Sequence, residues 1–357
     1  MAKKNKVLRV GFIGAGDIAD LQLKCLARRK DVVVQAIADI SERTLERRRS
    51  ELPDAHLYTD YQKMLKEERL DAVSVCTPNI HHMQPTIDAL KSKNHVLCEK
   101  PLAMSLVEGR KMLKAASAAR KKLIIGFQYR FDPRTQYLRQ AMEEGQFGKI
   151  LYGRVQAMRR RGIPNWGVFG RKDLQGGGPL IDIGVHVLEM THYTIGAPKP
   201  ISASADMFTY LGNKQSNDIQ SMWPNWDHEN YTVEDLAVGR IRFDNGCVLH
   251  IESAFAAHVP DSSLMNFQIM GEKGGATWDP AVIFTDEAGH MVNKEPAWLA
   301  STAFEKVFKR KMDAFVDHIL YNKPTIAPGK DGLVVQAMLN ALYSSAERGG
   351  KELAIKL

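Results

Sequence analysis

The chain has 357 residues, of which 44% are hydrophobic and 25% are charged. These values are typical of a soluble globular protein, and the length predicts two domains with a large buried core. Basic residues outnumber acidic ones by 49 to 41, which gives a formal net charge of +8. The basic residues are scattered and no known nucleic-acid motif accompanies them, so we expect no nucleic-acid partner.

Cysteine usage indicates a reducing compartment, and hydropathy indicates neither a signal peptide nor a membrane span. Cys25, Cys76, Cys98 and Cys247 show no CxxC spacing, so we expect free thiols. The apolar run at residues 7–13 contains an arginine and leads into glycines, which indicates a strand rather than a signal peptide. No apolar stretch is long enough to span a bilayer. We therefore expect a cytoplasmic protein with no membrane partner. We also expect no metal site, because no cluster of His, Cys and carboxylates shows ligand spacing.

A glycine-rich turn follows the first predicted strand. Residues 7–13 form this strand and a helical pattern runs to residue 29; between them stands Gly14-Ala15-Gly16-Asp17-Ile18-Ala19. In a GxGxxA turn, Gly14 permits the tight bend, Gly16 lets the backbone approach a pyrophosphate and Ala19 lets the helix pack on the strand. The helix N-terminus adds N–H donors and a positive dipole end. The alternative is a glycine turn without a ligand.

An acidic residue ends the second predicted strand. Residues 32–38 form this strand and Asp39 follows, roughly 20 residues after the glycine turn, as dinucleotide-binding units require. A carboxylate here accepts hydrogen bonds from the adenosine ribose and repels a 2′-phosphate, which favours NAD over NADP. Ser41 and Arg43 follow closely and would tolerate that phosphate, so NADP stays open. The next helix carries the arginine run 47–49, which we expect on a solvated face.

Strand and helix patterns then alternate as far as residue 125. Repeated βα units of this kind predict a doubly wound parallel sheet, the α/β architecture of a Rossmann domain. Thr77-Pro78-Asn79 and Glu99-Lys100 each follow an apolar strand, so we expect them at the carboxyl edge of the sheet, beside the glycine turn. We expect His81 and His82 on the surface of the following helix.

Lys100 is the first candidate catalytic residue. It stands at the carboxyl end of the buried strand 96–98, which Pro101 cuts off sharply. Open α/β sheets bind their ligands at this edge. There a lysine can donate a proton, or a hydrogen bond, to a reacting oxygen. The alternative is a solvated lysine at a strand end.

The pattern changes in the second half of the chain. The longer strands expected here are residues 150–158, 201–211, 236–243, 248–255 and 264–270. The sequence Asp244-Asn245-Gly246 predicts a hairpin turn between two of them. Strands joined by hairpins indicate a mostly antiparallel sheet, and hence an α+β second domain.

A second glycine-rich stretch lies within this half. It reads Gly176-Gly177-Gly178-Pro179-Leu180-Ile181-Asp182-Ile183-Gly184-Val185-His186. The glycines predict a loop, and Pro179 suits the first turn of a helix. Asp182 and His186 would then lie at i and i+4 on one helix face. Such a pair can act as a general base, with the carboxylate orienting the imidazole. The alternative is a structural hydrogen bond on a polar helix face.

Several of these stretches occur together in one known family. The chain resembles the Gfo/Idh/MocA family of glucose-fructose oxidoreductase and inositol dehydrogenase relatives. The matching stretches are residues 14–19, Cys76-Thr77-Pro78-Asn79, Glu99-Lys100-Pro101, Gly126-Phe127-Gln128-Tyr129-Arg130-Phe131, residues 176–186 and residues 343–350. The resemblance departs from the usual pattern at Gln128, where many members have Asn, and at Glu189, where many have Asp.

The resemblance implies a cofactor domain at residues 1–125 and a substrate domain at residues 126–357. In such proteins the open sheet of the second domain commonly builds homodimers or homotetramers. It also implies a catalytic trio, in which His186 takes the hydroxyl proton, Lys100 hydrogen-bonds the same oxygen and Asp182 positions the site.

Two sets of ligand contacts complete these predictions. The predicted NAD contacts are Gly14, Gly16, Asp17, Ile18, Asp39, Ser41, Arg43, Thr77, Pro78, Asn79, His82, Glu99, Lys100 and Gln128. The predicted substrate contacts are Lys100, Arg130, Trp166, Asp182 and His186. The aromatic and polar loop 223–231 either stacks on a sugar or covers a subunit interface.

Three functions are compatible with these observations. The leading hypothesis is an NAD(P)-dependent dehydrogenase that moves a hydride between nicotinamide and a secondary hydroxyl of a sugar, cyclitol or related polyol. The second is a sugar lyase, glycosidase or epimerase that uses tightly bound NAD transiently. The third is a nucleotide-sensing or structural protein, against which Lys100, Asp182 and His186 argue.

Overall fold

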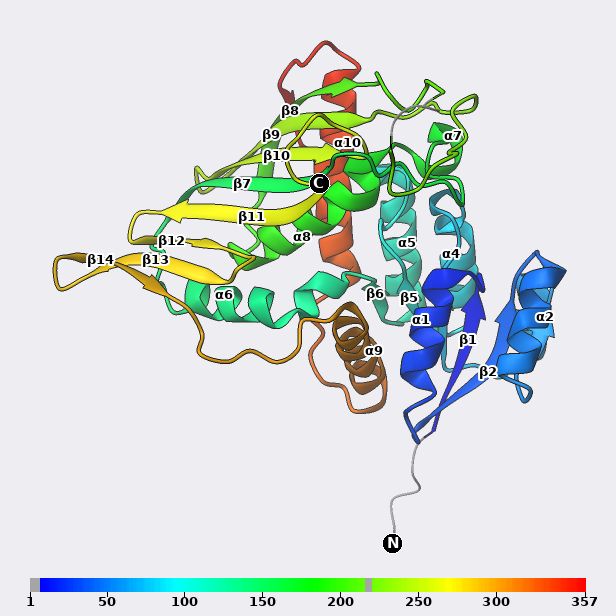
Figure 1. Ribbon diagram of the computed structural model, residues 1–357. Coiled ribbons are helices and arrows are strands. Elements are labelled where there is room, and N and C mark those ends of the chain that lie inside the picture. The colour runs from blue at the N-terminus through cyan, green and yellow to red at the C-terminus, as the bar shows by residue number, and fades with distance from the viewer. Residues whose placement is uncertain (1–6, 216–219) are drawn as a thin grey trace, which may run out of the picture. The chain divides into compact units, whose positions relative to one another are not determined.

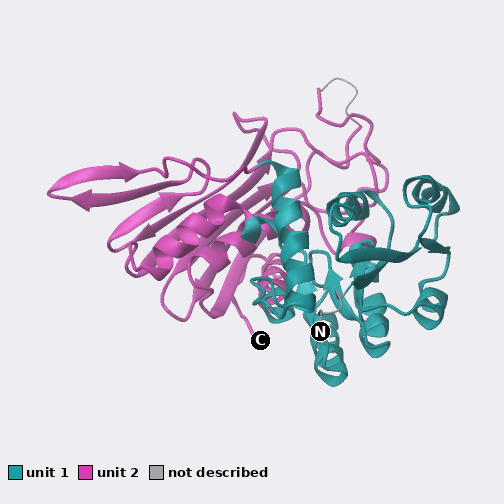
Figure 2. Ribbon diagram, turned by 90° about the horizontal axis from the view of Figure 1, so that it is seen from below, with its two compact units in different colours: residues 1–131, 303–333 teal, residues 132–302, 334–357 magenta. Residues whose placement is uncertain are grey.

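The computed structural model describes residues 7–215 and 220–357. The chain forms two compact units, shown in Figure 2: unit 1 comprises residues 1–131 and 303–333, and unit 2 comprises residues 132–302 and 334–357. The predicted domain boundary after residue 125 stays a prediction. The structure groups the segment 303–333 with unit 1, although the sequence interpretation left it in the second domain.

Unit 1 is built on a six-stranded sheet with strand order β3-β2-β1-β4-β5-β6, in which every neighbouring pair is parallel (Figure 1). The strands are β1 (Leu8–Ile13), β2 (Val32–Ala38), β3 (His56–Tyr58), β4 (Ala72–Val75), β5 (His95–Cys98) and β6 (Leu123–Ile125). The helices between them are α1 (Asp17–Leu26), α2 (Glu42–Glu51), α3 (Tyr61–Glu67), α4 (Met83–Lys91) and α5 (Leu106–Ala119). This order confirms the predicted doubly wound Rossmann sheet, whose switch point lies between β1 and β4.

Short polar side chains begin several of these helices. Ser41 caps α2 by accepting a hydrogen bond from the Thr44 amide, and Ser105 caps α5 by accepting one from the Glu108 amide. The Glu108 carboxylate in turn accepts from the Met104 amide at 3.0 Å. These reciprocal bonds satisfy backbone groups that a helix start leaves without intrahelical partners.

Helix α9 (Phe304–Leu320) packs on α1 within unit 1. Arg29 lies at this contact and forms ion pairs with Asp31, Asp313 and Asp317 at 2.8, 3.1 and 2.9 Å. Its guanidinium donates hydrogen bonds that lower the pKa of the Asp31 carboxyl to about 2. The pairs with Asp313 and Asp317 join residues 284 and 288 positions apart, which is why the helical pattern alone does not reveal where α9 belongs.

Unit 2 is built on a nine-stranded sheet with order β14-β13-β12-β11-β7-β10-β9-β8-β15. The strands are β7 (Ile150–Arg159), β8 (Pro200–Phe208), β9 (Leu236–Phe243), β10 (Val248–Ala254), β11 (Ser263–Gly271), β12 (Gly274–Thr277), β13 (Val282–Glu287), β14 (His290–Lys294) and β15 (Leu353–Ala354). All neighbouring pairs are antiparallel except β7 with β10. This confirms the predicted mostly antiparallel sheet, and Gly246 adopts φ +86° in the predicted β9–β10 turn.

Helices cover one face of this sheet. Figure 1 shows α6 (Pro133–Glu143) and α8 (Val185–Thr194) against it, and α8 packs on β7 and β11. Helix α7 (Lys172–Gln175) also belongs to unit 2, and α10 (Gly329–Ala346) begins in unit 1 and continues into unit 2. Along β7, Val155 is buried while Arg154 is exposed and pairs with Glu252 at 3.2 Å. This alternation gives the sheet one apolar and one polar face. The homodimer or homotetramer that the family resemblance implies stays a prediction.

Candidate active site

The glycine turn after β1 has the shape that a dinucleotide requires. Gly14 adopts φ +88°, and a Cβ atom added there would lie 2.6 Å from the Cys76 carbonyl oxygen at the end of β4. Only glycine fits this close approach. Gly16 differs, because no described residue other than its chain neighbours comes within 4 Å of a Cβ atom added there. The backbone is therefore open to a ligand at Gly16, directly before the N-terminus of α1.

Asp39 lies against this turn, as the spacing predicts. One carboxylate oxygen accepts the Ala15 amide at 2.8 Å and the other accepts the Ser41 amide at 2.8 Å. Ser41 caps α2, and Arg43 is exposed on the first turn of that helix. The structure thus brings Asp39, Ser41 and the glycine turn together at the end of β2.

The expectation that residues 47–49 lie on a solvated helix face is wrong for Arg48. Its side chain has no exposed surface, whereas the side chains of Arg47 and Arg49 are 48% and 65% exposed. Its Nε and Nη2 atoms donate to the Ala15 carbonyl at 3.1 and 2.9 Å, and Nη2 also donates to the Gly16 carbonyl at 3.1 Å. The available signal was position: Arg48 follows Leu45, the other buried residue of α2, by three residues.

The expectation that His82 is a surface residue is also wrong. It is 1% exposed, and its ring nitrogens lie 2.7 Å from the Pro101 carbonyl oxygen and 2.9 Å from that of Thr77. Burial lowers the pKa of the His82 imidazole. A neutral imidazole has one N–H, so it donates to one of these two carbonyls at a time. His82 therefore links the turn after β4 to the turn after β5.

Glu99, beside Lys100, faces the interior of unit 1. Its carboxylate is largely buried and accepts hydrogen bonds from Gln22 Nε2 and Lys311 Nζ, both at 2.6 Å. Gln22 in turn accepts the Ser74 hydroxyl at 2.6 Å. A buried carboxylate with paired donors fixes the backbone that carries it, so this network holds the strand end from which Lys100 extends. The predicted cofactor contact of Glu99 stays a prediction.

The residues after β6 form the short helix η2 (Gln128–Phe131). Arg130 is 1% exposed, and its Nη1 donates to the Ile326 carbonyl at 2.7 Å and to Asp331 at 2.6 Å. These internal partners tie η2 to the segment 303–333, and the predicted substrate contact of Arg130 stays untested. The Gln128 Oε1 atom is buried and has no hydrogen-bond partner within the described ranges.

These features fit a bound NAD. The open backbone at Gly16 suits a pyrophosphate, and the first-turn amides of α1, at Asp17 and Ile18, lack intrahelical partners by geometry. The buried acceptor of Gln128 suits a ligand that carries N–H or O–H donors. Thr77, Pro78 and Asn79 follow β4 at the switch point, where such sheets bind ligands.

Asp182 and His186 lie in unit 2, on one continuous helical segment. Asp182 falls in η3 (Leu180–Gly184), a single turn of π-helix, and His186 follows in α8. The predicted α-helical i, i+4 face is therefore interrupted between the two residues. Such turns are frequent at functional sites. Asp182 is half-buried and His186 is 7% exposed.

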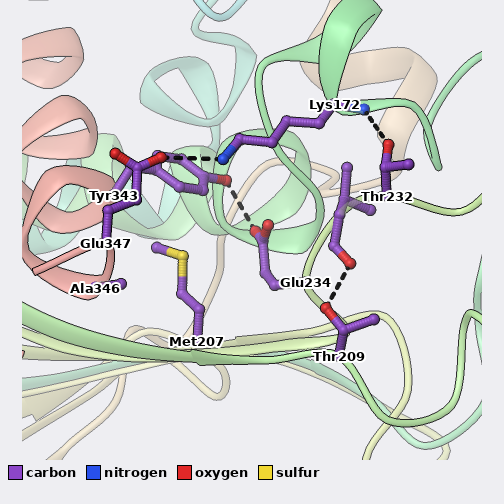
Figure 3. Close-up of a pocket in the computed structure, with 9 residues that line it drawn as sticks. Lys172, Met207, Thr209, Thr232, Glu234, Tyr343, Ala346 and Glu347 are labelled. Carbon is purple, nitrogen blue, oxygen red and sulfur yellow. Dashed lines mark hydrogen bonds and ion pairs between the residues drawn. The ribbon is translucent and has the colours of Figure 1, made fainter. Parts of the chain in front are cut away.

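The glycines before this segment pack against Glu234, which the sequence pattern does not reveal, and Tyr343, which the sequence singles out only as the start of the matching stretch 343–350 (Figure 3). Glu234 accepts the Gly178 amide at 2.9 Å, the Leu180 amide at 3.2 Å and the Tyr343 hydroxyl at 2.8 Å. Burial raises the pKa of the Glu234 carboxyl. A Cβ atom on Gly177 would overlap the Tyr343 hydroxyl, and one on Gly178 would lie 2.5 Å from the Glu234 carbonyl oxygen. Glu234 and Tyr343 thus hold the turn that leads into η3.

A pocket of about 240 Å³ lies beside this pair, and the ion pair of Lys172 with Glu347 at 3.0 Å stands at it. Figure 3 shows the Tyr343 hydroxyl directed at the Glu234 carboxylate. Both side chains lie too far along the chain from residues 176–186 for any spacing pattern to reveal them.

Trp166 lies in an aromatic cluster of unit 2. The residue is 44% exposed, and its ring stands edge-on to Trp223, with 4.8 Å between ring centroids. A pocket of about 50 Å³ beside it is also lined by Trp226 and Tyr231. Trp226 is buried and its indole N–H donates to the Gly212 carbonyl at 2.8 Å, so this ring serves packing. The choice between sugar stacking and a subunit interface stays open for the rest of the loop 223–231.

Comparison with known proteins accounts for both units. Residues 8–127 match the family model described as "Oxidoreductase family, NAD-binding Rossmann fold", and residues 139–355 match "Oxidoreductase family, C-terminal alpha/beta domain". The chain belongs to the Gfo/Idh/MocA oxidoreductase family. Its first unit is an NAD-binding Rossmann domain, and the predicted resemblance, enzyme class and NAD cofactor are confirmed.

Relatives within the family extend over the whole chain. D-glucoside 3-dehydrogenase of Escherichia coli (strain K12) is 37% identical, over 98% of both chains. Myo-inositol 2-dehydrogenase of Thermotoga maritima is 25% identical, over 95% of this chain and 96% of the relative. An oxidoreductase domain protein from Kribbella flavida has the same fold, with a TM-score of 0.86, 22% identity and coverage of 99% and 100%.

Two absences concern the described part of the chain alone. Within residues 7–215 and 220–357, no helix has the length and hydropathy to cross a membrane. The same residues contain no group of three or more His, Cys, Asp and Glu side chains that could hold a metal ion.

Proposed function

We propose that this enzyme uses NAD to oxidise a secondary ring hydroxyl of a sugar, and that the sugar is a D-glucoside. The observation that carries the proposal is the full-length similarity to D-glucoside 3-dehydrogenase, which is 37% identical over 98% of both chains. The more distant similarity to myo-inositol 2-dehydrogenase supports the wider class of ring polyols.

The chemistry assigns a separate task to each of three residues. His186 accepts the hydroxyl proton on a ring nitrogen, and Asp182 orients the imidazole and stabilises its charged form. Lys100 donates a hydrogen bond to the oxygen that loses the proton and stabilises the negative charge that develops there. NAD supplies the hydride acceptor when it is bound. The buried Glu99 network and the Glu234–Tyr343 pair support the backbone that carries these residues.

The test is to follow NADH fluorescence with purified protein and a panel of D-glucosides, aldoses and inositols, with NAD and NADP in separate reactions. We expect turnover with a glucoside and a preference for NAD, because a carboxylate at Asp39 would repel a 2′-phosphate. Lys100→Met should lower kcat about 100-fold or more. Lys91→Met, an exposed lysine at the end of α4, is the matched control and should keep the wild-type rate.

Three results would contradict the proposal or a part of it. If inositols reacted and glucosides did not, the substrate would be a cyclitol and not the proposed D-glucoside. Turnover without net NADH, from protein that keeps NAD through gel filtration, would indicate a lyase, glycosidase or epimerase that uses the cofactor transiently. A Lys100→Met variant with the wild-type rate would remove Lys100 from the mechanism.

A further inference from the structure

Arg48 is a fully buried charged residue that lies outside every stretch on which the family resemblance depends. A buried guanidinium is costly unless it is paired and hydrogen-bonded. Its Nη1 atom pairs with Asp20 of α1 at 2.7 Å and with Glu51 of α2. Two carboxylates therefore compensate its charge, so Arg48 is poorly suited to bind a phosphate directly.

The remaining donors of Arg48 point at the glycine turn. Nε and Nη2 reach the Ala15 carbonyl, and Nη2 also reaches the Gly16 carbonyl. These carbonyls belong to the two consecutive peptide units whose N–H groups are those of Gly16 and Asp17. In a trans peptide the C=O and N–H bonds point in opposite directions. A side chain that holds both carbonyls therefore directs both N–H groups away from itself.

The opposite side of the turn is the open one. No described residue other than its chain neighbours lies within 4 Å of a Cβ atom added to Gly16, and α1 begins at the next residue. Asp39 accepts the Ala15 amide at 2.8 Å. The turn is thus fixed on its carbonyl side and at Ala15 N–H, while the face that suits a pyrophosphate stays clear.

We propose that Arg48 is a positioning residue of the NAD site, which fixes the carbonyl side of the glycine turn so that its N–H groups are prearranged for the pyrophosphate. Prearranged donors bind more tightly because binding does not have to order them. The role differs from that of Asp39, which suits the ribose, and from that of Lys100, for which we propose a part in the reaction. It rests on the NAD-binding unit alone and not on the proposed substrate.

The experiment compares two neighbouring arginines in the full-length protein. NAD and ADP, which both carry a pyrophosphate, are titrated by calorimetry into wild type, Arg48→Met, Arg48→Lys and the control Arg49→Met. Arg49 is 65% exposed and pairs only with Glu46 among the ion pairs that the structure describes, at 3.1 Å. Melting temperature and hydrogen exchange of the amides in residues 14–19 are recorded without ligand.

We expect Arg48→Met to weaken NAD and ADP about tenfold, which corresponds to the loss of charge-assisted hydrogen bonds that order the turn. Exchange of the amides in residues 14–19 should be faster. Arg48→Lys keeps the charge opposite Asp20 and Glu51, but one ammonium cannot replace the planar fork. The affinity of Arg48→Lys for NAD and ADP should therefore lie between those of wild type and Arg48→Met, about threefold below wild type. Arg49→Met should bind as wild type does.

Three results would overturn the proposal. In the first, Arg48→Met melts earlier but binds NAD and ADP with wild-type affinity, which assigns Arg48 to packing alone. In the second, Arg48→Lys equals wild type in affinity and exchange, which makes charge rather than geometry the cause. In the third, Arg49→Met weakens NAD as much as Arg48→Met does. Should Arg48→Met fail to fold, the comparison of Arg48→Lys with wild type decides the question.

Discussion

Each compact unit contains a glycine turn that leads into a helix and is backed by a buried ionisable side chain, but the two side chains have opposite chemistry. In unit 1 the base Arg48 donates to the Ala15 and Gly16 carbonyls. In unit 2 the acid Glu234 accepts the Gly178 and Leu180 amides. The side chains therefore engage opposite backbone groups: carbonyls in the first turn and amides in the second.

This difference separates binding from support. The first turn has its carbonyls engaged and presents N–H groups, which suits an anionic pyrophosphate. The second turn has amides engaged by Glu234, so these cannot bind an anion, and the turn leads into the helical segment that carries Asp182 and His186. Glycine is needed in both turns, at Gly14 for close approach to β4 and at Gly177 for close approach to Tyr343.

The largest expected effect comes from removing the acid behind the second turn. Glu234→Ala leaves the Gly178 and Leu180 amides without their acceptor and opens a cavity. We expect a loss of about 3 kcal/mol in the free energy of unfolding, measured by urea denaturation. Glu347→Ala is the control, because Glu347 is 62% exposed in its pair with Lys172, and it should change stability by less than about 0.5 kcal/mol.

Activity adds a second measurement on the same variant. If the turn positions Asp182 and His186, the folded fraction of Glu234→Ala should show a lower kcat while its affinity for NAD stays unchanged. If the affinity of Glu234→Ala for NAD fell as much as its kcat, the two turns would not be independent. If its free energy of unfolding stayed at the wild-type value, Glu234 would not stabilise the fold.

A pair of glycine substitutions sharpens the comparison. In Gly177→Ala the new Cβ atom overlaps the Tyr343 hydroxyl, so we expect a loss of about 1–3 kcal/mol in stability. In Gly16→Ala the Cβ atom meets no described residue other than its chain neighbours within 4 Å and φ is −71°. Stability should then hold within about 0.5 kcal/mol, while NAD binding weakens because the methyl group occupies the open face. Calorimetric titration with NAD and urea unfolding of both variants check this, and the opposite pattern would contradict it.

The sequence predicts much of this arrangement because the signals are local. The GxGxxA turn, Asp39 and the alternating strands lie within about one βα unit of one another, so spacing and hydrophobic period predict the Rossmann sheet. The Asp244-Asn245-Gly246 turn predicts its hairpin for the same reason. The family resemblance adds candidate catalytic residues that no period could distinguish from surface side chains.

The sequence does not predict contacts that only the folded chain creates. Arg48 reaches a turn 33 residues away and Glu234 reaches Gly178 across 56 residues. Neither distance leaves a periodic trace. His82 looks like a polar residue at the start of a helix until Thr77 and Pro101 enclose it. The residue types around Asp182 do not distinguish a π turn from an α-helix. The longer hydrogen-bond spacing is therefore visible only in the folded backbone.

The smallest expected effect tests the acidity of Glu234 through its neighbour. Burial raises the pKa of Glu234 and the Tyr343 hydroxyl opposes that rise. Stability from this group is full below the unfolded pKa of about 4.3 and falls as pH rises through the raised folded value. Tyr343→Phe removes a donor that favours the carboxylate. It should lower the free energy of unfolding by about 1 kcal/mol, and by more at pH 8 than at pH 5.

Tyr321→Phe provides the matched control in unit 1. The Tyr321 hydroxyl donates to Asp31 at 2.8 Å, and hydrogen bonds from Arg29 hold the pKa of Asp31 at about 2. Asp31 is therefore ionised at both pH 5 and pH 8, and its loss of one hydrogen bond should cost the same at both. Urea unfolding of the two variants at the two pH values gives the comparison. A penalty for Tyr343→Phe that is also independent of pH would mean that Glu234 keeps one protonation state across this range, and that its buried carboxyl supports the second turn without titrating.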